Sequence, residues 1–310
     1  MTADVGIVIV THNSEAEIGP CLDAALATGA EVLVVDNASA DRTVDQVRGR
    51  PVALIANSTN LGFAAAVNQG IRAIRSDQIL LLNPDAVIET SIDPLSALCD
   101  RPEVGAAGGK LVDSHHASQA GFNVRRLPTP WVLALEVLLV NRLWPHNPAN
   151  WHYRCYDINL DVAAQVEQPA GAFLMFRRDI WELLGGFDER FSPIWFEDVD
   201  FCKRIRDRGY YVYYEPRVIA VHQGGHSIQK IKLEKRELYW YGNVLRYGFK
   251  HFRPAAARGL CLAVVLGSLL RAAAGIAAQR SFKPLRVYGR VIGMAGQYLL
   301  FGPQPGKSSF

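Results

Sequence analysis

The stretch VGIVIVTHN, residues 5–13, joins a continuous apolar run to three polar residues. A short apolar run of this kind is typical of a strand that is buried on both faces of a sheet. Three similar runs follow, namely EVLVVDN (31–37), VALIAN (52–57) and QILLLN (78–83). Helical spacing lies between the runs, at residues 15–27, 41–48 and 64–75. This alternation predicts an α/β fold with parallel strands.

Polar residues follow each of these predicted strands. Ligands of such sheets bind beyond the carboxyl ends of the strands, so these residues are candidate ligand contacts. Asp85, in LLLNPDA (80–86), can coordinate a divalent cation that neutralises a diphosphate. The Asn-Pro-Asp sequence also favours a simple turn. Asp36 can hold a base or a ribose, or it can cap the turn in DNASAD (36–41).

A cluster of acids lies in FSPIWFEDVDFCKR, residues 191–204. Carboxylates are costly to bury beside aromatic rings, and a helix start accounts for only one or two of Glu197, Asp198 and Asp200. His222 ends the apolar run VIAVH and can be a metal ligand or an ordinary surface histidine. The sequence holds neither GxGxxG nor GxxxxGK(S/T). Neither the Rossmann dinucleotide fingerprint nor a P-loop is therefore indicated.

Nine segments in a fixed order resemble the family-two glycosyltransferases, and above all their bacterial rhamnosyltransferase-like branch. The resemblance covers residues 5–227 and rests on VTHN (10–13), VVDNASADRT (34–43), NLGFAAAVNQGI (60–71), LLNPDA (81–86), GGKLVD (108–113), PAGAFLMFRR (169–178), GGFDERF (185–191), FEDVDFCKRIRDRGY (196–210) and VHQGGHS (221–227). It implies the nucleotide-diphospho-sugar transferase fold, also called the glycosyltransferase A fold, with a metal-dependent diphosphate site. We therefore expect a catalytic domain at residues 1–229 and a helical C-terminal segment at residues 230–310.

The resemblance also implies roles for individual residues. The nucleotide-sugar donor would be contacted by Thr11, His12, Asn13, Asp36, Asn60, Gly62, Phe63, Asn83 and Asp85. Within this set, Asp36 would hold the base or the ribose. Asn83 and Asp85 occupy the family's Asp-x-Asp position, where Asn replaces the first acid. Asp85 would therefore be the main ligand of Mg²⁺ or Mn²⁺, and His222 would be a further ligand.

Asp198 matches the catalytic base of the family, which would explain why acids gather among aromatic rings. An inverting transfer needs one base to take the proton of the acceptor hydroxyl as its oxygen attacks the anomeric carbon. Apolar rings disfavour the charged carboxylate, raise its basicity and offer a stacking surface for a sugar. Glu197 would instead hydrogen-bond the acceptor or orient the loop.

The charge of the chain is strongly asymmetric. Residues 230–310 carry fourteen Lys and Arg against two acids, a net +12, whereas residues 1–229 carry −9. Residues 259–270 form an uncharged run of 12 residues, which is short of the about 20 apolar residues that a membrane span needs. An apolar helix with basic flanks favours an anionic membrane surface over nucleic acid as the partner. Packing on the catalytic domain, or in a homodimer, is the alternative.

Processive relatives carry a QxxRW motif after the catalytic acids, and this sequence has none. We expect a non-processive enzyme that moves L-rhamnose from dTDP-L-rhamnose to a polyprenyl-diphosphate-linked glycan at the inner face of the cell membrane. A UDP- or GDP-linked donor and a catalytically silent nucleotide-sugar-binding subunit are the alternatives. The five scattered cysteines indicate no disulfide framework and fit a reduced, cytoplasmic compartment. The N-terminal residues carry an acid where a signal peptide would be basic, so we interpret them as leading into the first strand.

Overall fold

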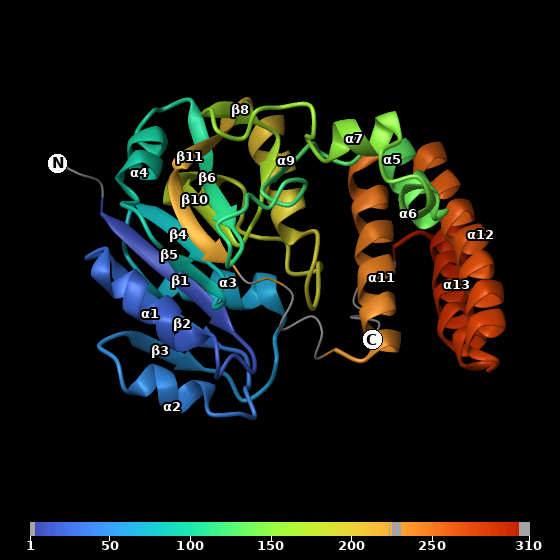
Figure 1. Cartoon of the computed structure of the whole chain (residues 1–310), viewed down its shortest axis with the longest axis horizontal. Coiled ribbons are helices and arrows are strands. Elements are labelled where there is room, and N and C mark those ends of the chain that lie inside the picture. The colour runs from blue at the N-terminus through green and yellow to red at the C-terminus, as the bar shows by residue number, and fades with distance from the viewer. Residues whose placement is uncertain (1–3, 223, 225–230, 304–310) are drawn as a thin grey trace. The chain divides into compact units, whose positions relative to one another are not determined.

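The computed structural model describes residues 4–222, 224 and 231–303 (Figure 1). These residues divide into two compact units. The first unit comprises the described residues of Met1–Leu127, Arg154–Glu189 and Glu197–Lys230. The second comprises those of Pro128–Tyr153, Arg190–Phe196 and Ile231–Phe310. The predicted boundary near residue 229 lies close to the last change of unit, but two earlier segments also belong with the C-terminal helices. A catalytic domain of residues 1–229 stays a prediction.

A mixed sheet, nine-stranded among the described residues, forms the centre of the first unit. Four strands are parallel and lie in the order β3-β2-β1-β4, with bounds Ala53–Ala56, Glu31–Asp36, Val5–Thr11 and Gln78–Leu82. The sheet continues through β10 (Phe173–Arg177), β6 (Val104–Val112), β11 (Tyr211–His222) and β5 (Ala86–Ile88), and β8 (Ala164–Val166) pairs with β11. The predicted α/β class is confirmed, and the four predicted parallel strands are present.

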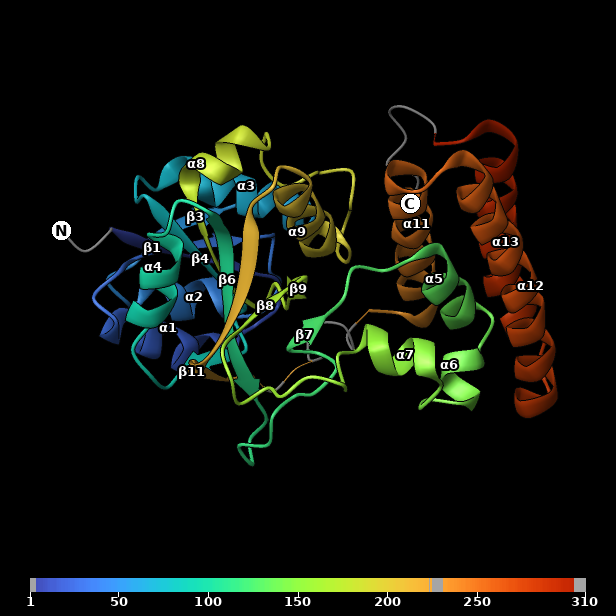
Figure 2. The ribbon, with the colours of Figure 1, turned by 90° about the horizontal axis from the view of Figure 1, so that it is seen from above.

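Helices cover both faces of this sheet, as Figure 2 shows. One face packs on α1 (Ile18–Ala27), α2 (Thr43–Arg48) and α4 (Asp93–Cys99). The other face packs on α3 (Phe63–Ala73), α8 (Arg178–Leu183) and α9 (Glu197–Asp207). The central strands β1, β2, β4 and β10 are buried on both sides, which is why they are continuously apolar rather than alternating.

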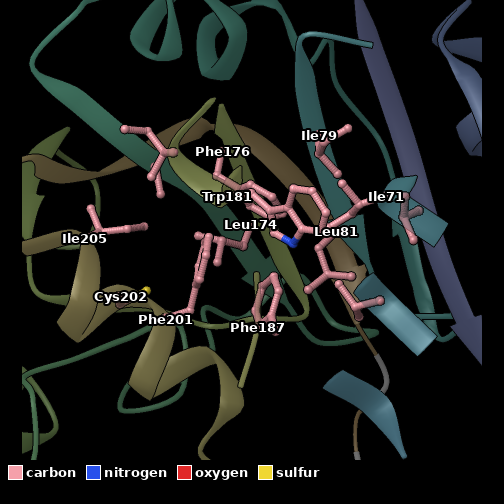
Figure 3. Packing of buried hydrophobic residues seen from close by; sticks show 14 of the residues in the cluster. Ile71, Ile79, Leu81, Leu174, Phe176, Trp181, Phe187, Phe201, Cys202 and Ile205 are labelled. Carbon is pink, nitrogen blue, oxygen red and sulfur yellow. The ribbon is translucent and has the colours of Figure 1, made fainter. Parts of the chain in front are cut away.

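Aromatic rings fix the position of α9 on the sheet (Figure 3). Phe201 of α9 stacks on Phe187, with ring centroids 4.2 Å apart, and meets Phe176 of β10 edge-on at 5.0 Å. Ile205, one turn after Phe201, is also fully buried in this cluster. The apolar spacing of α9 therefore places the first turn of the helix, where the acids lie, at the edge of the core.

The structure corrects the predicted layout of the last strands. The segments YYVYYEP (210–216) and VIAVH (218–222) each predict a short strand, but residues Tyr211–His222 form the single strand β11. Its parallel register to β6 shifts between Glu215 and Ile219, so an irregularity in one strand replaces the expected break. A separate two-stranded sheet joins β7 (Val124–Arg125) to β9 (Gln168–Pro169).

Helices form the second unit: α5 (Pro130–Val137), α6 (Val140–Leu143), α7 (Pro148–Tyr153), α11 (Leu233–His251), α12 (Pro254–Gln279) and α13 (Lys283–Phe301). The sequence predicts a single helix near residues 131–143, but the structure breaks it at Leu139, which has a left-handed φ of 68°. Arg271 of α12 donates from Nη2 to the Glu136 carbonyl at 3.2 Å and from Nη1 to the Val137 carbonyl. These bonds tie α12 to the last carbonyls of α5.

Among the described helices, α12 is the one long and apolar enough to cross a membrane by length and composition. Of its most apolar 18-residue window, 33% is buried within the protein. Four leucines on its outer face are about half exposed: Leu262, Leu266, Leu269 and Leu270. Arg271 is the one charged residue between Gly259 and Gln279, and it is bonded inward to α5. The exposed face of α12 is therefore uncharged over this length.

Candidate active site

The carboxyl ends of β1 and β2 carry the first group of candidate residues. Thr11 and Asp36 are paired in the sheet register, and Thr11 Oγ1 donates to Asp36 Oδ1 at 2.8 Å. Ser39 donates to the same carboxylate from Oγ (2.5 Å, to Oδ1) and from its backbone N (2.9 Å, to Oδ2). Asp36 is only 1% exposed. In this structure it organises the loop after β2, and its contact with a base or ribose stays a prediction.

His12 and Asn13 extend this group toward solvent. His12 Nδ1 donates to the Asn37 carbonyl at 2.8 Å, so Nε2 accepts from Asn13 Nδ2 at 3.3 Å. Asn13 has a left-handed φ of 56°; its backbone N donates to Ser39 Oγ at 2.8 Å, and its Oδ1 accepts from the backbone N of Ala40 at 2.8 Å. The loops after β1 and β2 are thus tied into one surface.

The segment of Asn60, Gly62 and Phe63 joins the same surface. Gly62 N donates to Asn60 Oδ1 at 2.9 Å, and the Gly62 carbonyl accepts from Asn37 Nδ2 at 3.1 Å. Gly62 has a φ of 87°, a conformation that glycine adopts at low cost, and it precedes the first turn of α3. Phe63 begins α3 and packs against the core. The structure therefore brings these three residues to the loops that carry Thr11 and Asp36.

Asp85 and His222 form the second group. Asp85 follows β4 and His222 ends β11, and His222 Nε2 lies 3.4 Å from Asp85 Oδ1. Both side chains are largely buried, at 4% exposure for His222 and 11% for Asp85. The Phe122 ring stacks on the imidazole, with centroids 5.3 Å apart and planes 8° from parallel. Two residues 137 positions apart in the chain are thus placed together, as the metal-ligand prediction requires.

Gln119 fixes which nitrogen of His222 faces Asp85. Gln119 Nε2 donates to the His222 carbonyl at 2.5 Å, so its Oε1 must accept from His222 Nδ1, at 3.1 Å. A neutral His222 then carries its lone pair on Nε2, toward the carboxylate of Asp85. Two electron-rich atoms 3.4 Å apart attract a cation beside them. An imidazole whose other N–H is held by an acceptor is the usual form of a metal ligand.

These donors fit a divalent cation. Asp85 and His222 offer one carboxylate oxygen and one imidazole nitrogen, a set that suits Mn²⁺, and Mg²⁺ sites often complete themselves with phosphate oxygens and water. Among the described residues no group of three or more His, Cys, Asp or Glu side chains is placed to hold a metal. Residues 223 and 225–227 of the VHQGGHS segment lie outside the described residues.

Asp198 lies in the first turn of α9, and its carboxylate is held on both oxygens. Oδ2 accepts from the backbone N of Gly171 at 3.0 Å and from Gln168 Nε2 at 3.2 Å, and Oδ1 accepts from the backbone N of Val199 at 2.8 Å. Burial raises the pKa of the Asp198 carboxyl, against the Gly171 and Val199 hydrogen bonds and the Arg125 charge, which lower the pKa. A carboxylate with a raised pKa is a stronger base.

The segment Ala170–Ala172 connects Asp198 to the end of β4. While Gly171 donates to Asp198, the carbonyl of Ala172 accepts from the backbone N of Asn83 at 2.9 Å. Asn83 is two residues before Asp85. The candidate base and the candidate Asp-x-Asp position are therefore bonded to adjacent residues of one short segment, which places them in the same site.

The neighbouring acids play different parts. Asp200 is fully buried and accepts from Arg204 Nε at 2.8 Å, which marks it as a structural acid of α9. Glu197 is 5% exposed, and its proposed contact with the acceptor stays a prediction. Sequence reasoning missed Gln119, Gln168 and the role of Gly171. Only Gly171 had a local signal, because glycine within PAGAF indicates a close approach to the backbone.

Comparison with known proteins gives the site a context. The model of the family described as Glycosyl transferase family 2 matches residues 6–182. An N-acetylglucosaminyl-diphospho-decaprenol L-rhamnosyltransferase from Mycobacterium tuberculosis is 29% identical over 253 residues, which cover 73% of this chain and 78% of the relative. The likeness to the rhamnosyltransferase-like branch is thereby confirmed.

Two solved structures share the fold. The mannosyltransferase PcManGT from Pyrobaculum calidifontis, in complex with GDP-Man and Mn²⁺, aligns with a TM-score of 0.55 at 18% identity, covering 98% of this chain and 89% of that one. S. aureus TarS 1–349, in complex with UDP-GlcNAc, aligns with a TM-score of 0.53 at 16% identity, covering 95% and 81%. The predicted glycosyltransferase A fold is therefore confirmed.

Proposed function

The chain belongs to glycosyl transferase family 2, and from this premise we propose that it is an inverting, non-processive rhamnosyltransferase. It is a glycosyltransferase, and its proposed donor is dTDP-L-rhamnose. The proposed acceptor is a sugar on a polyprenyl diphosphate. Both assignments are supported by the likeness to the mycobacterial L-rhamnosyltransferase, which is named for a decaprenol-linked N-acetylglucosamine.

The observation that carries the proposal is the link from Asp198, through Gly171 and Ala172, to Asn83 after β4. In an inverting transfer, the acceptor oxygen attacks the anomeric carbon as the bond from that carbon to the diphosphate oxygen breaks. The diphosphate leaves with the bonding electron pair, and the hydroxyl proton passes to Asp198. The raised pKa of this carboxyl suits it to take that proton. Glu197, at the start of the same helix, is proposed to contact the acceptor.

A bound divalent cation would neutralise charge that develops on the departing diphosphate. Asp85 and His222 are the residues proposed to hold it, with Gln119 fixing the histidine tautomer. The donor's nucleotide is proposed to lie on the surface formed by Thr11, Asp36 and the segment 60–63. These catalytic and binding residues all belong to the proposed catalytic domain, residues 1–229.

The C-terminal segment 230–310 is proposed to hold the enzyme on the inner face of the cell membrane. Residues 238–310 contain no Asp or Glu and ten Lys and Arg, which complements an anionic lipid surface. The exposed leucines of α12 would add apolar contact. Since α12 is packed along one side by α5, α11 and α13, we propose that it lies on the bilayer rather than spans it. Nucleic acid is not a proposed partner.

The test is a transfer assay with the full chain, a polyprenyl-diphosphate-linked N-acetylglucosamine acceptor, and Mg²⁺ or Mn²⁺. dTDP-L-rhamnose, a UDP-sugar and a GDP-sugar are compared, and the anomeric configuration of the product is determined by NMR. Product from dTDP-L-rhamnose alone, with inverted configuration, is the expected result. Preference for a UDP- or GDP-sugar would refute the donor assignment. No product with any donor, although donors bind, would favour a silent binding subunit.

A further inference from the structure

The loop that leads into the catalytic acids has an unusual backbone. Trp195 and Phe196, immediately before Glu197, have φ values of 81° and 73°. This left-handed region is disfavoured for residues with a β-carbon, and two consecutive aromatic residues rarely adopt it. Backbone strain of this kind persists only where surrounding contacts hold it, and it is frequent at active sites.

The hydrogen bonds that hold this loop to α11 come from one buried side chain. Asn243, which is fully buried, donates from Nδ2 to the carbonyl of Ile194 at 2.8 Å and to that of Trp195 at 3.1 Å. The guanidinium of Arg246 donates to Asn243 Oδ1. The amide is therefore oriented with its N–H groups toward the loop, because Oδ1 faces the arginine.

Two further contacts lie on the same face of α11. The Phe196 ring packs against Tyr247, with centroids 5.4 Å apart, and the ammonium of Lys250 lies 5.5 Å from the centre of the Phe191 ring. Positions 243, 247 and 250 follow the i, i+4, i+7 spacing of one helix face. The face of α11 that they form therefore meets the loop at several points, and Asn243 supplies its hydrogen bonds to the backbone.

We propose that Asn243 is a positioning residue for Asp198. Its hydrogen bonds hold the strained turn at Trp195–Phe196, and that turn sets the direction in which α9 begins. Within the first unit, Gly171 and Gln168 hold the Asp198 carboxylate directly. Without Asn243, the turn would relax to an ordinary backbone conformation and the first residues of α9 would move with it. This inference rests on the proposed role of Asp198 as the base.

The experiment compares Asn243→Ala and Asn243→Asp with Val244→Ala in the full chain. Asp has the shape of Asn but cannot donate to the carbonyls, so it separates hydrogen bonding from packing. Val244 is a buried neighbour on the same helix, and its truncation controls for lost stability. The readouts are kcat with saturating acceptor, the KM and calorimetric Kd of the donor, and the temperature of unfolding.

We expect both Asn243 variants to lose kcat by roughly 10²-fold, the effect of a misplacement of about 1 Å at a reacting group. Donor Kd should be unchanged, because the hydrogen bonds that Asn243 donates go to the carbonyls of Ser192, Ile194 and Trp195. Val244→Ala should keep its kcat. The inference would be overturned by any of three results. These are a wild-type kcat in either Asn243 variant, an equal loss of kcat in Val244→Ala, and a loss that affects only donor binding.

Asp198→Asn separates this inference from the function on which it rests. An inactive Asp198→Asn protein together with fully active Asn243 variants would overturn the positioning role alone. Full activity in Asp198→Asn would overturn the proposed base and the positioning role together.

Discussion

Gly171→Ala tests the placement of the proposed base, because Gly171 lies against the Asp198 side chain. A β-carbon at position 171 would lie 2.7 Å from Asp198 Cβ and 2.9 Å from its Oδ2. Carbon atoms pack at about 3.5–4.0 Å, so Asp198 would have to move by about 1 Å. Its bond to Gly171 N would then stretch or break. A displacement of about 1 Å can cost roughly 10²-fold in rate, and this corresponds to about 2.7 kcal/mol of barrier.

We therefore expect Gly171→Ala to lower kcat by roughly 10²-fold and to keep the donor KM. Overpacking of this kind also costs about 1–3 kcal/mol of folding free energy, so thermal unfolding is measured beside the steady-state transfer assay. Gly49→Ala is the control, since a β-carbon there would have its nearest neighbours at 3.8 Å. A folded Gly171→Ala protein with the kcat of wild type would refute the placement of Asp198 as the base.

Three further predictions concern the proposed base, the proposed metal ligand and the exposed face of α12. Asp198→Asn should abolish transfer and keep donor binding. Burial raises the pKa of this carboxyl in the folded state, so the wild type loses stability as the pH rises from the unfolded-state pKa through the folded-state pKa. The Asn variant should therefore unfold at a higher temperature than wild type at neutral pH, but not below pH 3.8. A difference in unfolding temperature that stays the same at every pH would contradict this. Asp85→Ala should weaken Mn²⁺-dependent binding of a nucleoside diphosphate in calorimetry, and equal wild-type affinity with and without metal would exclude the metal role. The double variant Leu266→Glu/Leu269→Glu should no longer float with anionic vesicles. The control variant Leu183→Glu, at an exposed position of α8, should still float. Flotation of the double variant would place the membrane contact elsewhere.

Local patterns in the sequence were enough to predict the four parallel strands and the polar residues that follow them. The strands β1 to β4 differ from their predicted ranges by no more than a residue at each end. A continuous apolar run and the polar residue that ends it are properties of neighbouring residues, which a single sequence displays directly. The same applies to the first turn of α9, where the acids and the apolar spacing lie within a few residues.

The contacts that tune the site could not be predicted in this way. Gln119 is 103 residues from His222, and Gly171 is 27 residues from Asp198. Such pairs depend on which strands become neighbours in the sheet, and β10 and β11 join it out of chain order. The helix break at Leu139 could not be predicted, because the residue with the left-handed backbone conformation is a leucine and not a glycine or an asparagine.

The C-terminal segment, which we propose to bind the membrane, also contacts other parts of the second unit. Its helix α12 approaches the end of α5 so closely that a β-carbon at Gly267 would lie 1.9 Å from the Val137 carbonyl oxygen. Its helix α11 holds the loop before Glu197 and the proposed base Asp198 through Asn243. Truncation after residue 229 would remove both partners at once, so loss of activity would not reveal whether the membrane or the loop was responsible. Substitutions on the exposed face of α12 separate the two, because they leave Arg271 and Asn243 in place. With a short-chain, water-soluble acceptor, Leu266→Glu with Leu269→Glu should keep the kcat of wild type while membrane binding is lost. A fall in kcat with that acceptor would show that this face supports the fold of the second unit rather than a lipid surface.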